Sequence, residues 1–271
     1  MNMNPDESFV EFQNVRHAFG ENHLYEDLSL SVRRGETMTI LGGSGSGKSV
    51  MLKLLIGLLR PDAGSIRFDG QELVTLSEQA LLPVRRRISM LFQGGALFDS
   101  LTVGENVAYP INEHLRLSLA ETKERVEAKL ALVGLPGIAQ QWPAQLSGGM
   151  RKRVAIARAI AADPDVLLYD EPTTGLDPIS ARRINELIMS IQRELHVTSL
   201  VVTHDMASAF MISDRMAMLS ERRILTPLSC EDFRQSQEPA IYDFVTAMSL
   251  DLSARPHPQS PVRPGEEGPK K

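Results

Sequence analysis

The sequence predicts an α/β fold in which helices pack on a mainly parallel sheet. Short apolar runs typical of buried strands alternate with helical stretches, which parallel strands need as crossovers. A glycine-rich segment, residues 42–49, lies between one of these strands and a helix. Residues 8–35 instead alternate apolar Leu28, Leu30 and Val32 with polar neighbours, the period of half-buried strands. We therefore expect an antiparallel β subdomain before the parallel core sheet.

Composition places the chain among soluble globular proteins. Its 271 residues are 42% hydrophobic and 23% charged, enough for one large domain. A net charge of −5 argues against nucleic acid as a partner, which would favour a basic surface. The single cysteine, Cys230, excludes an intramolecular disulfide and indicates a reducing compartment. No apolar run approaches the roughly 20 residues of a membrane span, and residues 1–7 do not resemble a secretory signal, so we expect a cytosolic chain.

Residues 42–49 match the phosphate-binding template G-x-x-x-x-G-K-[ST]. An apolar strand at 37–41 precedes them and an apolar helix at 50–59 follows, a context that argues against an accidental glycine-rich turn. In such a loop the backbone N–H groups and the helix dipole converge on an anion, Lys48 reaches the outer phosphates, and Ser49 binds the Mg2+ of a nucleotide. The predicted nucleotide-binding residues here are Gly42, Gly43, Ser44, Gly45, Ser46, Gly47, Lys48, Ser49 and Val50.

A turn and two short strands follow the glycine-rich segment. Pro61 and Gly64 mark the turn, and residues 65–70 and 88–92 are the strands. The triplet at 85–87 is three arginines, which we expect on a solvated surface; contact with a phosphate or an acidic partner is the alternative.

Residues 98–161 have helical character. A capping box formed by Ser118 and Glu121 opens a helix to about residue 133, and a second helix begins near Ser147 and ends at about residue 162. These stretches predict a helical subdomain inserted over about residues 94–162. One side of the first helix carries Leu119, Val126, Leu130 and Val133.

The α/β pattern returns after residue 162. A buried strand at 166–169 is followed by an amphipathic helix at 178–195, a strand at 199–203 and a hairpin at 215–225. The last 17 residues, 255–271, contain five prolines and are predicted to be disordered. The core face of the amphipathic helix is predicted to carry Ile184, Leu187, Ile188, Ile191 and Leu195.

Two acidic residues end the strand at 166–169. Beside a phosphate-binding loop, Asp170 is expected to hold Mg2+ and Glu171 to polarise a water molecule for attack on the γ-phosphate. An ordinary acidic turn is the alternative, and the phosphate-binding loop in the same chain argues against it.

The run Leu146-Ser147-Gly148-Gly149, which heads a helix about twenty residues before that strand, resembles the signature of ABC-transporter ATPases. The resemblance covers residues 8 to about 228 and implies a P-loop NTPase fold whose ABC ATPase domain spans residues 1–254. Met150 departs from the Gln that is commonest there. The family's residue roles fall on four further positions: Gln93 of the Q-loop, a Mg2+ ligand; Asp177 of the D-loop, an ATP contact; His204, the switch histidine at the γ-phosphate; and Phe19, which stacks on adenine.

Tyr25 is a second candidate for stacking on adenine, and either aromatic could instead belong to the core. The resemblance assigns catalysis to Lys48, Glu171 and His204. It also implies that ATP is sandwiched in a head-to-tail dimer, where Ser147, Gly148 and Gly149 of a second copy form the other anion site.

Residues 90–110, which include Gly95-Ala96-Leu97-Phe98 and Asn106-Val107-Ala108-Tyr109-Pro110, resemble the Mla/Mce-type phospholipid transport ATPases. This resemblance implies a multispanning permease and an Mce-domain lipid-binding protein as partners, and it allows a small accessory subunit in the same complex. It places the chain at the cytoplasmic side of a bacterial inner membrane. The segment 94–110 is expected to be flexible, and Phe98 and Tyr109 are expected in the subdomain core or on the rim of a groove for the permease. A transporter for another solute, or a soluble ABC mechanoenzyme, is the alternative.

Overall fold

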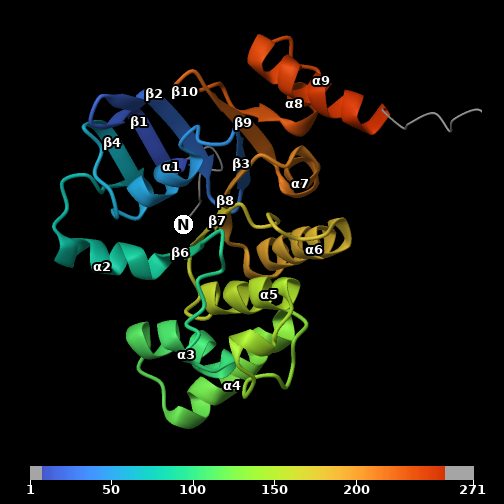
Figure 1. The fold of residues 1–271 in the computed structure, drawn as a ribbon. Coiled ribbons are helices and arrows are strands. Elements are labelled where there is room, and N and C mark those ends of the chain that lie inside the picture. The colour runs from blue at the N-terminus through green and yellow to red at the C-terminus, as the bar shows by residue number, and fades with distance from the viewer. Residues whose placement is uncertain (1–7, 254–271) are drawn as a thin grey trace, which may run out of the picture.

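Strands in the described part of the chain form one mixed sheet (Figure 1). The computed structural model describes residues 8–253, so the predictions for residues 1–7 and for the tail at 255–271 lie outside it. The strands are, in order across the sheet, β5 (Gln71–Glu72), β4 (Ala63–Phe68), β1 (Ser8–Phe19), β2 (Asn22–Arg33), β10 (Arg223–Ile224), β9 (Arg215–Ser220), β3 (Thr37–Leu41), β8 (Thr198–Thr203), β7 (Val166–Asp170) and β6 (Ile88–Leu91); β11 (Leu228–Ser229) pairs with β9.

The sheet divides into the two parts that the sequence predicts. Strands β1, β2, β4 and β5 pair antiparallel, whereas β6, β7, β8, β3 and β9 run parallel. The predicted hairpin is formed by β9 and β10, with the charged residues Glu221 and Arg222 at its tip. Because the core strands are parallel, their carboxyl ends meet at one edge of the sheet, where ligands of open α/β sheets bind.

Alternating side chains of the parallel strands build two cores. Leu168 of β7 and Leu200 of β8 point into a core that also holds the helix α1 (Lys48–Leu55) and the antiparallel strands, and Figure 1 shows α1 enclosed between the strands. Their neighbours Leu167 and Val201 point into a second core. That core contains residues of the helices α3 (Val103–His114), α4 (Leu119–Leu132), α5 (Gly148–Ala159) and α6 (Pro178–Leu195).

The helices α3 to α5 extend from one end of the sheet in Figure 1. The Ser118 capping box is confirmed as the start of α4, but Leu119 does not face the core: it is 87% exposed, and Thr122 is buried instead. A second capping box, which the prediction missed, joins Thr102 and Glu105 at the start of α3. The segment 94–110, which is predicted to be flexible, is therefore helical from residue 103. The boundaries of a separate helical subdomain stay a prediction.

The arginine triplet lies at the end of a helix that the prediction missed, α2 (Glu78–Arg87). Arg85 donates to the carbonyls of Ile56 and Gly57, and Arg87 donates to Asp69 and Asp165 at 2.6 and 2.5 Å. The predicted solvated surface is confirmed for Arg86, which is exposed, and for Arg87, whose side chain is 41% exposed although it pairs with two carboxylates. The prediction is wrong for Arg85, whose half-buried side chain lies against two backbone carbonyls.

Three further helices lie in the carboxyl-terminal part of the described chain. They are α7 (Met206–Ile212), α8 (Cys230–Arg234) and α9 (Pro239–Ser253), and Figure 1 shows them beside β9 and β3. Within residues 8–253, no helix has both the length and the apolar character that crossing a membrane demands.

Candidate active site

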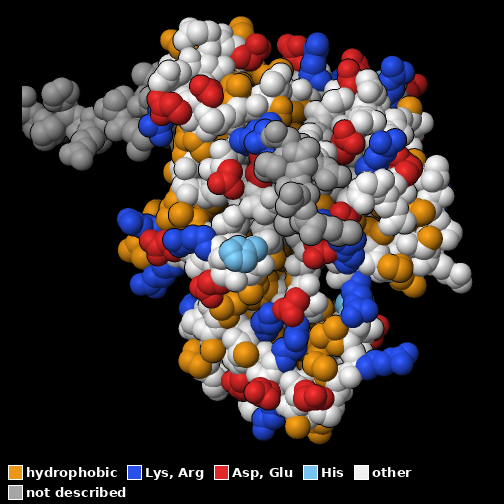
Figure 2. Space-filling model, turned by 180° about the vertical axis from the view of Figure 1, so that it is seen from behind, with side chains coloured by type: hydrophobic (Ala, Val, Ile, Leu, Met, Phe, Trp, Pro, Cys, Tyr) orange, Lys and Arg blue, Asp and Glu red, His pale blue; other side chains and the backbone are white. Residues whose placement is uncertain are grey.

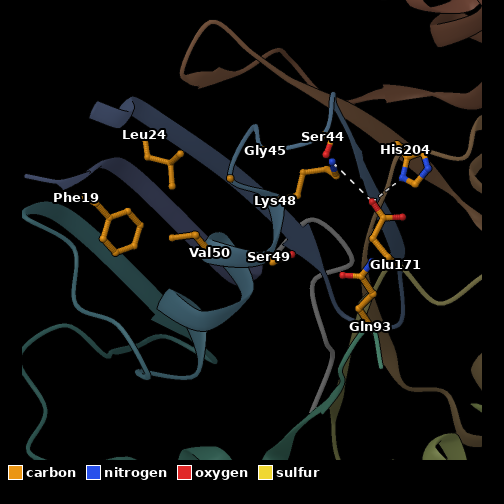
Figure 3. Close-up of a pocket in the computed structure, with 11 residues that line it drawn as sticks. Phe19, Leu24, Ser44, Gly45, Lys48, Ser49, Val50, Gln93, Glu171 and His204 are labelled. Atoms are coloured by element: carbon orange, nitrogen blue, oxygen red, sulfur yellow. Dashed lines mark hydrogen bonds and ion pairs between the residues drawn. The ribbon is translucent and has the colours of Figure 1, made fainter. Parts of the chain in front are cut away.

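A cavity of about 530 Å³ opens at the carboxyl edge of the parallel strands, beside the start of α1 (Figure 3). Ten predicted site residues line it, drawn from five separate segments of the chain. Gly42, Gly43 and Ser46 do not line the cavity but belong to the same loop as the lining residues Ser44 and Gly45. The full lining is Phe19, Leu24, Ser44, Gly45, Gly47, Lys48, Ser49, Val50, Gln93, Glu171 and His204.

Two glycines of the loop, Gly42 and Gly47, lie too close to neighbouring atoms to carry a side chain. Gly47 has φ +105° and is the N-cap of α1, and a Cβ there would lie 2.8 Å from the Leu24 side chain. A Cβ at Gly42 would lie 2.9 Å from the carbonyl oxygen of Leu219. Any larger residue would therefore push the loop away from β2 and β9, and would change the direction in which its N–H groups point.

Lys48 is buried and folds back over its own loop. Its Nζ donates to the carbonyls of Gly42 and Gly43 at 2.8 and 2.9 Å, and lies 3.8 Å from Glu171 Oε1. Burial lowers the pKa of Lys48, while the charges of Glu171 and Asp170 oppose that change. A phosphate in the cavity would offer this ammonium an anionic acceptor, which forms stronger hydrogen bonds than a neutral carbonyl.

Glu171 is buried just beyond β7, with a backbone φ of +49° that is uncommon for a residue other than glycine. The hydroxyls of Thr174 and Thr203 donate to its Oε2 at 3.2 and 3.0 Å, and His204 Nδ1 lies 2.9 Å from Oε1 (Figure 3). The carboxylate is thus fixed in place and faces the cavity. Sequence reasoning missed both threonines; only Thr203 carried a signal, as the residue before the predicted His204.

Three oxygen-bearing side chains meet at the base of the cavity. Ser49 Oγ donates to Asp170 Oδ1 at 2.6 Å, and the side chain of Gln93 points toward the same space. Hydroxyl, carboxylate and amide oxygens suit a hard divalent cation. No group of three or more His, Cys, Asp or Glu residues within 8–253 is arranged to hold a metal ion. Ser49, Asp170 and Gln93 are the side chains that would hold a divalent cation here.

The two aromatic candidates have different surroundings. Phe19 is 51% exposed at the cavity mouth, where its ring packs edge-on against His17 with centroids 4.7 Å apart. Tyr25 is 1% exposed and its hydroxyl donates to the carbonyl of Gly47, so its ring is part of the core. Of the two, Phe19 has the face that is free to stack on a planar base.

A second group of four predicted residues lies on α5 and α6, away from the phosphate-binding loop and outside the cavity lining. Ser147 caps α5 by accepting from Met150 N, and Asp177 caps α6 by accepting from the N–H groups of Ile179 and Ser180 at 3.0 Å. The starts of these two helices adjoin, since a Cβ on Gly149 would lie 3.7 Å from Ser180 Oγ. Ser147 and Gly148 are exposed, so this helix N-terminus presents N–H groups to the outside of the chain. The residues of this second group are Ser147, Gly148, Gly149 and Asp177.

Comparisons with known proteins agree with this geometry. The sequence model of the ABC transporter family matches residues 25–174. Over 244 residues the chain is 41% identical to the intermembrane phospholipid transport system ATP-binding protein MlaF of Haemophilus influenzae, covering 90% of this chain and 92% of the relative. It is also 41% identical over 241 residues to the probable ribonucleotide transport ATP-binding protein mkl of Mycobacterium tuberculosis, covering 89% of this chain and 67% of the relative.

A solved structure shares the fold as well. The dimeric, post-hydrolysis ATP-binding cassette MJ0796, bound to ADP and Pi, superposes with a TM-score of 0.75 at 33% identity, covering 82% of this chain and 98% of that one. The family model, the relatives and the solved structure all belong to ATP-binding transport proteins, in agreement with a nucleotide-binding cavity at the phosphate-binding loop. The chain belongs to the ABC transporter family, as an ATP-binding subunit that hydrolyses ATP.

Proposed function

We propose that this chain drives an ABC transporter that moves phospholipids between the inner and outer membranes of a bacterium. The observation that carries the chemical part is the fixed Glu171 carboxylate, which faces the cavity beside the buried Lys48. In this proposal the loop 42–49 holds the phosphates, Val50 and Phe19 contact the nucleoside, and Glu171 accepts a proton from the attacking water.

His204 and Lys48 support that step. The imidazole of His204 contacts both the γ-phosphate and the Glu171 carboxylate, and so aligns the water between them. The ammonium of Lys48 donates to phosphate oxygens in place of the Gly42 and Gly43 carbonyls, and its positive charge balances the negative charge of the phosphates. Ser49, Asp170 and Gln93 would hold Mg2+, which supplies charge neutralisation at the β- and γ-phosphates when it is bound.

The active form is proposed to be a head-to-tail pair of this chain. Ser147, Gly148, Gly149 and Asp177 do not line the cavity of their own chain, yet α5 presents its positive N-terminus to the outside. A second copy that brings this end over the cavity would enclose the γ-phosphate from both sides. The dimeric form of the related MJ0796 cassette supports this arrangement.

The proposed cargo rests on the relatives named for phospholipid transport, at 41% identity in Haemophilus influenzae and 38% in Escherichia coli. A permease, an Mce-domain protein and a small accessory subunit complete the proposed complex at the cytoplasmic face of the inner membrane. Ribonucleotides are the second candidate cargo, because the mycobacterial relative is named for their transport at 41% identity. Phe98 and Tyr109 are both exposed, with ring centroids 5.1 Å apart, so they do not belong to the subdomain core, which is one of the two predicted alternatives. We propose that this pair contacts the permease from the helical side.

Purification from the native cell tests the transport assignment. The chain is tagged, the membranes are solubilised gently, and the proteins that co-purify are identified, with an untagged strain as the control. A multispanning permease together with an Mce-domain protein is the expected result. A permease with a small-solute-binding protein would contradict the lipid cargo, and ribosomal or chromosomal proteins without a permease would contradict transport.

A further inference from the structure

Lys152, one turn into α5, is a buried cation that none of the roles above uses. It is 7% exposed, and burial lowers its pKa while the charges of Asp170 and Glu171 oppose the change. Burying an ammonium is costly unless hydrogen bonds compensate. Its Nζ donates to the backbone carbonyl of Gln93 and, at 3.5 Å, to that of Glu171. One side chain therefore contacts two backbone segments of the catalytic cavity.

A second cation on the same helix face holds the neighbouring backbone. Arg158 donates to the carbonyls of Gly95 and Ala96 at 3.0 and 2.7 Å. Between the two cations, Ala155 lies against Gly95, where an added Cβ would come within 3.5 Å of its own Cβ. Residues 152, 155 and 158 recur every three positions and so share one face of α5. The loop from residue 93 to residue 96 is thus fastened to this helix along its length.

The same helix begins at the exposed Ser147 and Gly148. Gln93 and Glu171 face the cavity of this chain, whereas the start of α5 faces outward. We propose that Lys152 is a positioning residue that holds the backbone of Gln93 and of Glu171 to α5. Through this contact, the occupancy of one cavity is linked to the position of the helix end that closes the other cavity of the pair. The inference rests on the proposed dimeric ATPase.

Substitution of Lys152 in the full-length chain separates positioning from nucleotide binding. Lys152→Met should lower kcat for ATP hydrolysis about tenfold, in the range of energetic coupling through contiguous contacts. The Kd for ATP should stay within about threefold, because Lys152 does not line the cavity. Lys152→Arg should retain most of the activity, since a guanidinium also donates to carbonyls. Lys123→Met, which removes an exposed lysine of α4, should match the unmodified chain.

Several results would overturn this role. These are an unchanged kcat in Lys152→Met, a parallel loss of ATP affinity, or a failure of Lys152→Arg to restore activity. If Lys152→Met does not fold, Lys152→Gln, which keeps a donor but no charge, is measured in the same way. Lys48→Ala is included to separate the two proposals: hydrolysis that survives in this variant would contradict the proposed function itself. If Lys48→Ala is inactive while Lys152→Met is fully active, the positioning role alone is wrong.

Discussion

The chemistry at the residue scale depends on how one carboxylate is held. Glu171 is oriented by two threonine hydroxyls and lies within 2.9 Å of His204 Nδ1, so it needs little reorganisation before it accepts a proton. The ammonium of Lys48 lies 3.8 Å from Glu171 Oε1, so the same positive charge would attract both the carboxylate and a bound phosphate.

Glu171→Gln keeps the size of this side chain but removes its ability to accept a proton. We expect kcat to fall about 10²- to 10⁴-fold, the usual contribution of a general base, while ATP still binds. Steady-state hydrolysis and equilibrium ATP binding of the purified variant measure the two effects. Undiminished hydrolysis would contradict the assignment of Glu171 as the base.

The sequence predicts the polar residues in and beside this cavity better than the groups that orient them. Lys48, Ser49 and Asp170 are recognisable because their motifs are continuous in sequence and each follows an apolar strand. Thr174 and Lys152 act on Glu171 and Gln93 through contacts that only the fold creates. The choice between Phe19 and Tyr25 as the aromatic that stacks on adenine likewise depends on how far each ring is buried. Their burial follows from the pairing of β1 with β2 rather than from local sequence.

Charge pairs link elements of the helical side, and Figure 2 shows Lys and Arg side chains interspersed with Asp and Glu over this face of the molecule. Lys129 Nζ donates to Asp163 at 2.6 Å and Arg125 also donates to it, so α4 is joined to the turn that follows α5. Partial burial would raise the pKa of Asp163, but the hydrogen bonds and charges of Lys129 and Arg125 outweigh burial and lower it.

Asp163→Asn tests this link. Asn tolerates the φ of +50° at this position, so the substitution changes the charge and not the backbone. We expect the free energy of unfolding to fall by about 0.5–1 kcal/mol near pH 7, since the pair is half exposed. The folded-state pKa is lowered, so the difference from the unmodified chain stays constant above the ordinary pKa of 3.8 and is lost as the pH falls through the lowered value.

Urea unfolding of both chains across this pH range measures the effect, with the exposed Asp99→Asn as the control for loss of an acidic charge. A difference that grows on acidification would contradict the proposed link.

Elements with a strong period and a clear cap are predicted closely. The helix α6 spans the predicted residues 178–195, because Asp177 caps it and one apolar face runs along its length. The helix α2 was missed because Pro83 lies within it, and a proline inside a helical pattern usually marks its end. Leu119 was assigned to the core from its spacing alone, but as the first residue of α4 it lies beyond the contact with α3 and α5.

The whole molecule carries the two proposed halves of a nucleotide site at separate places on one chain. One half is the cavity around Lys48 and Glu171, and the other is the exposed start of α5 at Ser147. The family resemblance already implies that the two halves come from different copies, and in the structure Ser147, Gly148 and Gly149 indeed lie outside the cavity lining of their own chain. The central claim is therefore that two copies complete each other's sites around ATP.

Light scattering tests whether two copies share their nucleotide sites. It measures the molar mass of the Glu171→Gln chain in solution, with and without ATP and Mg2+. We expect ATP to convert this variant from a monomer to a dimer, because ATP that is not hydrolysed keeps the two halves together. Adding Ser147→Arg should leave it monomeric although ATP still binds. A Glu171→Gln chain that binds ATP and stays monomeric, or a dimer that persists with Ser147→Arg, would contradict a nucleotide site shared by two copies.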